Sequence, residues 1–223
     1  MFVKDFLERL LHLLFPPRCP FCRGFLAYGV CLCDKCKDTL PYVKPEELFT
    51  KGNYFTKALA PFSYEGAVRD ALHAYKFEGK SMYAPYFAEI LAESIAENLE
   101  NCYDVISYIP ISKQRKGKRG YDQGELLAKA CAKRLNMPLY CTLKKVVHTK
   151  AQSSLGGLDL RAGNIKDAYE VIEKATIEGK RILLVDDICT TGATFSEASK
   201  CLLKAGVEEV LCVSVAKTLK NRV

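Results

Sequence analysis

Residues 186 to 194 have the types and spacing needed to hold a sugar phosphate. An apolar run at residues 182–185 breaks into two adjacent acids, two threonines and Gly192, after which a helical pattern begins. A turn that enters a helix at a glycine offers converging N–H donors and the positive end of the helix dipole to a phosphate. Adjacent acids would repel a phosphate at close range, so we expect them to bind vicinal hydroxyls instead. Phosphate and diol together describe a ribose 5-phosphate.

An ordinary capped helix start is the alternative interpretation, because Thr194 or Asp187 could cap the helix without any ligand. It accounts for one residue and leaves the paired acids unexplained. Residues 185–194 resemble the phosphoribosyl-pyrophosphate signature of the type I phosphoribosyltransferases. By that resemblance Asp186 and Asp187 would hold the ribose hydroxyls. The residues that would cradle the 5-phosphate are Thr190, Thr191, Gly192, Ala193 and Thr194.

A strongly basic segment follows a second expected strand, and five of the seven residues from 113 to 119 are cationic. Arg115 and Arg119 could clamp the pyrophosphate of phosphoribosyl pyrophosphate, for which the forked guanidinium is suited. Alternatively, the run could follow the backbone of a nucleic acid while Tyr121 stacks a base. A solvated charge run is the third interpretation. The nucleic-acid candidates are Lys113, Arg115, Lys116, Lys118, Arg119 and Tyr121.

A long polar segment at residues 148–164 is expected to be a functional loop, since structureless segments of this length are uncommon inside a domain. Lys150 and Arg161 could meet negative charge that develops during a reaction. Breaking a ribosyl C–O bond would need magnesium, cationic groups and exclusion of water. The expected catalytic residues are therefore Lys150, Arg161, Asp186 and Asp187, with Mg²⁺ bound alongside the ligand.

Two Cys-x-x-Cys pairs lie near the amino end, in a proline-rich stretch with too few apolar residues for a core of its own. Two such pairs complete a tetrahedral site, and four thiolates with no catalytic water indicate a structural zinc. An iron–sulfur cluster and a redox-active pair are the alternatives. The expected metal ligands are Cys19, Cys22, Cys33 and Cys36, and Cys31 is a fifth thiol that could replace one of them.

The elements that must position these residues alternate between strand and helix patterns. Strands are expected at residues 57–64, 104–109, 138–143, 181–185 and 209–215, and helices at 66–75, 82–99, 123–135 and 195–205. This alternation predicts an α/β fold with a parallel sheet covered on both faces and ligand loops at the carboxyl edge. The expected units are an N-terminal helix and four-cysteine zinc finger (1–45), a linker (46–55) and a phosphoribosyltransferase-like domain (56–223).

Composition fits a packed intracellular protein, with 49% hydrophobic and 26% charged residues in a chain of 223. No apolar stretch is long enough for a membrane-spanning helix. Residues 1–15 carry charges within their apolar pattern, so we expect a helix packed on its own protein, with a membrane-surface anchor as the alternative. The odd count of eleven cysteines indicates a reducing cytoplasm and not disulfides.

The order of these features resembles the ComF family over almost the whole chain. The matching features are the four-cysteine unit, residues 64–77 with Gly66, Arg69 and Lys76, residues 115–123, residues 152–164 and the Asp186 loop. ComF proteins resemble type I phosphoribosyltransferases with an added zinc finger and are linked to natural competence. The family usually has Asn where Asp122 stands, and commonly Arg where His148 stands.

The resemblance implies a cytoplasmic ComF-type competence protein that binds phosphoribosyl pyrophosphate with Mg²⁺ and assists uptake or handling of single-stranded transforming DNA. Partners such as a competence helicase or DNA-processing proteins are implied with it. An active phosphoribosyltransferase that transfers ribose 5-phosphate to a base in salvage is one alternative. A module that senses phosphoribosyl pyrophosphate and transfers nothing is the other, so enzymatic activity stays open at this point.

Overall fold

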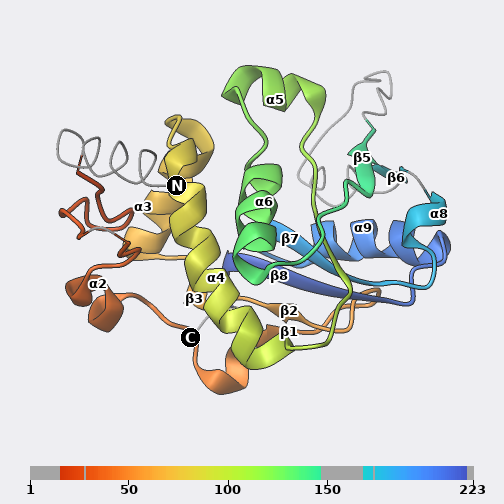
Figure 1. Cartoon of the computed structure of the whole chain (residues 1–223), viewed down its shortest axis with the longest axis horizontal. Helices are drawn as coiled ribbons and strands as arrows, with labels where there is room; N and C mark the ends of the chain where they lie inside the picture. The colour runs from red at the N-terminus through yellow and green to blue at the C-terminus, as the bar shows by residue number, and fades with distance from the viewer. Residues whose placement is uncertain (1–15, 28, 147–167, 173, 220–223) are drawn as a thin grey trace, which may run out of the picture.

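A mostly parallel β-sheet forms the centre of the computed structural model, which describes residues 16–27, 29–146, 168–172 and 174–219 (Figure 1). The strand order is β1–β2–β8–β7–β4, with β3 also paired to β8. Only β1 runs antiparallel to its neighbour in this sheet. The strands are β1 (Phe49–Thr50), β2 (Ala58–Leu59), β3 (Phe62–Ser63), β4 (Val105–Tyr108), β7 (Arg181–Cys189) and β8 (Glu209–Lys217).

Helices cover both faces of this sheet, as the sequence predicts (Figure 1). On one face, α4 (Ala84–Leu99) and α6 (Gln123–Leu135) share a core with Leu183 and Val185 of β7. On the other face, α9 (Ala193–Lys204) packs over Ile182 and Leu184. A strand buried from both sides must be apolar throughout, which is why residues 182–185 contain no polar side chain. The remaining helices are α2 (Asp34–Thr39), η1 (Pro45–Glu47), α3 (Gly66–Phe77), η2 (Ser81–Tyr83), α5 (Lys113–Arg119) and α8 (Lys174–Ile177).

Several expected elements differ from those observed. The strand expected at residues 57–64 is two short strands, and the one expected at 138–143 is reduced to a bridge between Leu139 and Ile106. Beyond that bridge, β5 (Leu143–Lys145) pairs with β6 (Tyr169–Val171) in a separate antiparallel sheet. The strand expected to end at residue 185 continues to Cys189, because its ladder with β8 continues past the two acids.

The basic segment, expected as a loop, contains the helix α5. The side chain of Ser112 caps its first turn by accepting a hydrogen bond from the backbone N–H of Arg115 (3.3 Å). Gly120 ends it in the left-handed conformation at φ 80°, which glycine adopts without strain. Both ends of α5 therefore have ordinary capping residues. The sequence interpretation missed them because it considered mainly the charges of this segment.

The cysteine-rich unit is joined to the rest of the molecule by backbone pairing. The N–H of Val43 donates to the carbonyl of Pro61, and that of Ser63 donates to the carbonyl of Pro41, both at 2.8 Å. The range expected as a linker, 46–55, contains β1, which adds to the edge of the main sheet. The domain boundaries at residues 45 and 55 stay predictions.

No helix within the described residues combines the length and apolar character needed to cross a membrane. The amphipathic segment expected at residues 1–15 lies outside the described residues.

Candidate ligand pocket and metal centre

A pocket of about 340 Å³ opens at the carboxyl ends of β4 and β7. Asp186, Asp187 and Thr190 line it from β7 and the turn that follows. Arg115 and Arg119 line it from α5, which follows β4. Two motifs that are far apart in the sequence thus share one site, because parallel strands bring their carboxyl ends to the same edge of the sheet.

The two acids have different neighbours within the pocket. A carboxylate oxygen of Asp187, which is only 5% exposed, lies 2.9 Å from the ammonium of Lys76 on α3. Asp186 accepts a hydrogen bond from the backbone N–H of Asp187 (2.8 Å). Burial, reinforced by the charge of Asp187, raises the pKa of Asp186 well above its ordinary value, although Lys76 opposes this shift. The site without ligand therefore resists holding two negative charges, so a bound cation or hydroxyl donors would stabilise the ionised pair.

The turn after β7 leads into α9 at a glycine. Gly192 caps α9 in the left-handed conformation at φ 75°, and a side chain there would also contact Phe55. The hydroxyl of Thr191 accepts a hydrogen bond from the N–H of Ala193 at 3.3 Å, which holds the turn closed. Thr190 and Thr194 line the pocket itself. Of the five expected phosphate-binding residues, two thus face the ligand space and the other three form the turn.

Lys76, Lys145 and Tyr169 are among the lining residues that were absent from the predicted site. Lys76 was noted in a matching segment but given no role, and its ion pair with Asp187 could not be seen from local pattern. Lys145 and Tyr169 come from the β5–β6 pair, and the Lys145 ammonium lies 5.1 Å from the Tyr169 ring centroid. Burial and the nearby charge of Arg115 lower the pKa of Lys145. The pocket is therefore more cationic than the sequence motifs indicated.

The segment around α5 is anchored by side chains expected to bind ligands. Arg119 donates to the side-chain oxygen of Gln123 at 2.9 Å. The hydroxyl of Tyr121 donates to the carbonyl of Tyr75, and the two rings lie 6.0 Å apart. Tyr121 is thus used to tie this segment to α3, which leaves little of its ring for a nucleic-acid base. Its stacking role stays an untested prediction.

Of the two family departures and the two catalytic candidates in the polar loop, the structure describes Asp122 alone. The Asp122 carboxylate caps α6 and accepts from the backbone N–H groups of Ile111 (2.9 Å) and Glu125 (3.2 Å). Burial raises its pKa. Asp122 is thus a structural acceptor here. The other departure, His148, and the catalytic candidates Lys150 and Arg161 lie outside the described residues, so their roles stay predictions.

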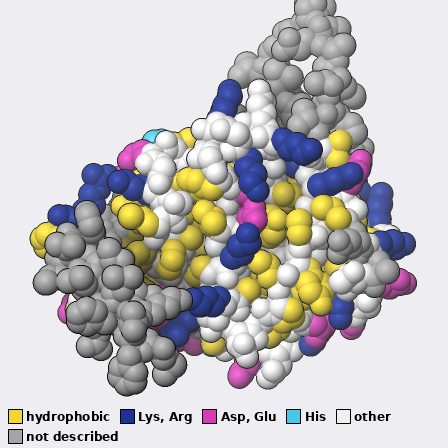
Figure 2. Space-filling view, turned by 45° about the horizontal axis from the view of Figure 1, so that its top comes forward, with side chains coloured by type: hydrophobic (Ala, Val, Ile, Leu, Met, Phe, Trp, Pro, Cys, Tyr) yellow, Lys and Arg dark blue, Asp and Glu magenta, His cyan; other side chains and the backbone are white. Residues whose placement is uncertain are grey.

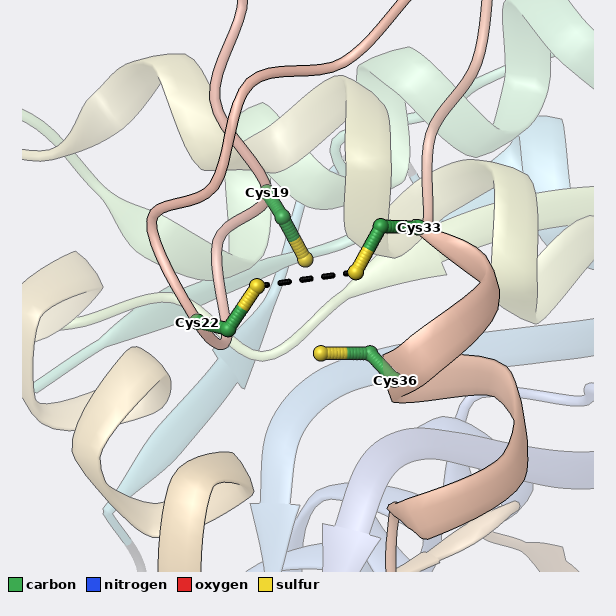
Figure 3. Close-up of side chains that lie close together, drawn as sticks. All are labelled: Cys19, Cys22, Cys33 and Cys36. Carbon is green, nitrogen blue, oxygen red and sulfur yellow. Dashed lines mark hydrogen bonds between the residues drawn. The ribbon is translucent and has the colours of Figure 1, made fainter.

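The metal centre is formed by the four cysteines that the spacing predicted. Their sulfur atoms all lie within 4.8 Å of one another and point toward a common centre (Figure 3). The sulfurs of Cys22 and Cys33 are 3.5 Å apart, close to the ~3.8 Å edge of a tetrahedron with Zn–S bonds of ~2.3 Å. Cys31 is not part of this group. The backbone amide of Gly24 lowers the pKa of the Cys22 thiol to about 7, which favours the thiolate that zinc requires.

The zinc unit shares its hydrophobic core with the larger domain. Cys19 is fully buried, and the ring of Phe21 lies 5.8 Å from that of Phe62 and 5.9 Å from that of Phe87. These side chains belong to the same buried cluster as Val185 in the central sheet. The unit therefore does use a core, but one supplied largely by the rest of the protein.

A larger hollow of about 600 Å³ lies between the zinc unit and α4. Its lining includes Glu89, Glu93 and Glu97 of α4, together with Lys37. Three carboxylates disfavour a phosphorylated ligand, so the smaller cationic pocket is the better candidate for a sugar phosphate.

Comparisons with known proteins support both halves of this description. Residues 122–222 match the phosphoribosyl transferase domain family, and residues 10–47 match the double zinc ribbon domain family. The chain is 29% identical to competence protein ComFC of Streptococcus pneumoniae over 204 residues, covering 84% of this chain and 88% of that protein. The chain is thus similar to a ComF competence protein over most of its length.

Two other ComF relatives show the range of the similarity. Competence protein F of Haemophilus influenzae is 37% identical over 116 residues, which span 51% of this chain and 50% of that protein. The DNA utilization protein YhgH of Salmonella typhimurium is 26% identical over 210 residues, 90% of each chain. The chain therefore combines a type I phosphoribosyltransferase-like fold with a four-cysteine zinc ribbon.

Proposed function

We propose that this protein binds phosphoribosyl pyrophosphate with Mg²⁺ in the pocket and holds single-stranded DNA on the basic helix beside it. The observation that carries the proposal is the convergence of the phosphate loop, the paired acids and two arginines on one pocket. Relatives named for competence and for DNA utilization support a role in handling DNA. Phosphoribosyl pyrophosphate alone would not explain the basic helix, and single-stranded DNA alone would not explain the paired acids.

The proposed ligand fits the pocket group by group. Its 5-phosphate would lie at the turn before α9, where backbone amides and the helix dipole favour an anion. Its ribose hydroxyls would donate to Asp186 and Asp187. Its pyrophosphate would meet Arg115 and Arg119, whose guanidinium groups suit phosphate oxygens. Mg²⁺ prefers oxygen ligands and enters sites largely on substrate phosphates, which agrees with two carboxylates at the pocket wall.

The DNA surface is proposed on α5 because its charges lie outside the pocket as well as in it. Lys113 and Lys118 are exposed, and neither has an ion pair with any described residue. Lys116 pairs with Glu125 at 2.9 Å but is also exposed. Figure 2, turned so that the α5 end comes forward, shows Lys and Arg side chains across this face with few acids between them. Such a surface suits a phosphate backbone without sequence preference.

Replacing Lys76 with methionine is expected to weaken binding of phosphoribosyl pyrophosphate about tenfold, because one charged hydrogen-bond donor in the pocket is lost. Isothermal titration calorimetry in magnesium buffer measures the change. Lys80→Met is the matched control, since Lys80 is exposed and does not line the pocket. Equal or tighter binding by Lys76→Met would mean that Lys76 only neutralises Asp187.

A further inference from the structure

Phe77 is a large apolar side chain that the fold leaves in water. It is the last residue of α3 and is 60% exposed. The buried face of α3 consists of other residues, including Leu72 and Tyr75. The packing of α3 therefore does not require an aromatic ring at this position.

The ring of Phe77 packs against Arg119, which lines the ligand pocket. The guanidinium carbon of Arg119 is 4.6 Å from the ring centroid, within the range of a cation–π contact. The His73 ring lies 5.0 Å away, and His73 itself pairs with Glu78 at 3.4 Å. Both Arg119 and Lys76, the neighbour of Phe77 in the chain, line the pocket. Phe77 thus stands where the basic helix meets the pocket.

The other exposed aromatic residues that the structure describes lie elsewhere on the molecule. Phe25 is similarly exposed, at 65%, and lies under Arg18 at 4.2 Å, but it belongs to the zinc ribbon. Tyr54 is exposed beside Lys200 at 6.0 Å, near α9. The cations beside these two rings, Arg18 and Lys200, do not line the pocket, whereas Arg119 beside Phe77 does. The hydroxyl of Tyr121 is held by Tyr75.

We infer that Phe77 is a platform on which one base of a bound single strand stacks while the exposed lysines of α5 hold the neighbouring phosphates. The inference rests on the proposed DNA function and adds to it the aromatic contact that charge alone does not provide. Single-strand binding surfaces combine a cationic path with aromatic faces, because every base has a face that can stack. The exposed lysines of α5 beside the pocket favour a nucleic acid over a protein as the occupant.

Tryptophan fluorescence tests this directly, because the chain contains no tryptophan. The Phe77→Trp variant is expected to show fluorescence quenching by oligothymidylate that saturates together with binding followed by anisotropy of a labelled strand. Phe25→Trp, an equally exposed ring beside an arginine, is expected to stay unquenched. The Phe77→Ala variant is expected to bind about tenfold more weakly with an unchanged salt dependence, since no charge is removed.

The possible results distinguish a failure of the stacking inference from a failure of the proposed DNA function. If the wild type binds oligothymidylate but Phe77→Trp is not quenched and Phe77→Ala binds normally, the stacking role is wrong and the DNA function stands. Quenching at Phe25→Trp alone would move the contact to the zinc ribbon and overturn the inference. If the wild type binds no oligonucleotide, the proposed DNA function fails together with the inference.

Discussion

Serine replacements at Cys19 and Cys22 are expected to release the zinc and to destabilise the whole protein. The metal supplies much of the folding free energy of a small zinc unit. Because Phe21 lies between Phe62 and Phe87, loss of the ribbon also removes a buried aromatic from the main core. Large-to-small changes at such sites cost about 3–5 kcal/mol. The melting temperature should therefore fall by roughly 10 °C or more.

Metal content by atomic emission and thermal unfolding by circular dichroism measure the two effects. Cys31→Ser is the matched control, because this thiol lies in the same unit but outside the group of four sulfurs. It should keep its zinc and its melting temperature. A metal-free Cys19→Ser, Cys22→Ser protein that melts like the wild type would contradict a structural zinc coupled to the main core.

Reversing the charges of Lys113, Lys116 and Lys118 to glutamate is expected to reduce affinity for single-stranded DNA about a hundredfold at low salt. The slope of log affinity against log salt should become shallower by about 2, since each lost phosphate contact removes about 0.7 for a single strand. The three lysines do not line the ligand pocket. Binding of phosphoribosyl pyrophosphate should therefore be unchanged, which Arg115 or Arg119 variants could not show.

Fluorescence anisotropy of a labelled oligonucleotide at several salt concentrations measures both quantities. The charge-matched control reverses Lys133, Lys174 and Lys204, three exposed lysines outside α5. If this control loses as much affinity as the α5 variant, the effect comes from net charge and α5 is not the binding surface. An unchanged salt slope in the α5 variant would exclude phosphate contacts at these lysines.

Much of the fold follows from local pattern, and the exceptions have physical causes. Residues 182–185 predict a central strand because only a strand buried on both faces is apolar throughout. The extension of β7 to Cys189 was not predicted, because adjacent acids normally interrupt a strand. Here the strand continues past the two acids because its pairing with β8 continues to Cys189. The helix α5 was missed because its charges outweighed the capping signals of Ser112 and Gly120.

The candidate site was partly predictable from the sequence, because some of its residues lie close together in the chain and others do not. The four cysteines lie close together in sequence, so their spacing alone predicts the group of sulfurs, and spacing likewise indicated the Asp186 turn and the two arginines that line the pocket. Lys145 and Tyr169 enter the pocket through a pairing of distant strands that no local signal reveals. Lys76 meets Asp187 only once α3 packs beside the sheet. Contacts between distant segments are therefore what the structure adds.

We propose that the pocket at the end of β7 binds phosphoribosyl pyrophosphate. This binding is tested most directly by calorimetric titration of this ligand with Mg²⁺ into the wild type and into an Asp186→Asn, Asp187→Asn variant. The matched control, Asp38→Asn with Asp70→Asn, changes two exposed acids that do not line the pocket. We expect saturable binding by the wild type and the control, and a loss of about a hundredfold or more in the pocket variant. No binding by the wild type, or equal binding by the pocket variant, would contradict the account.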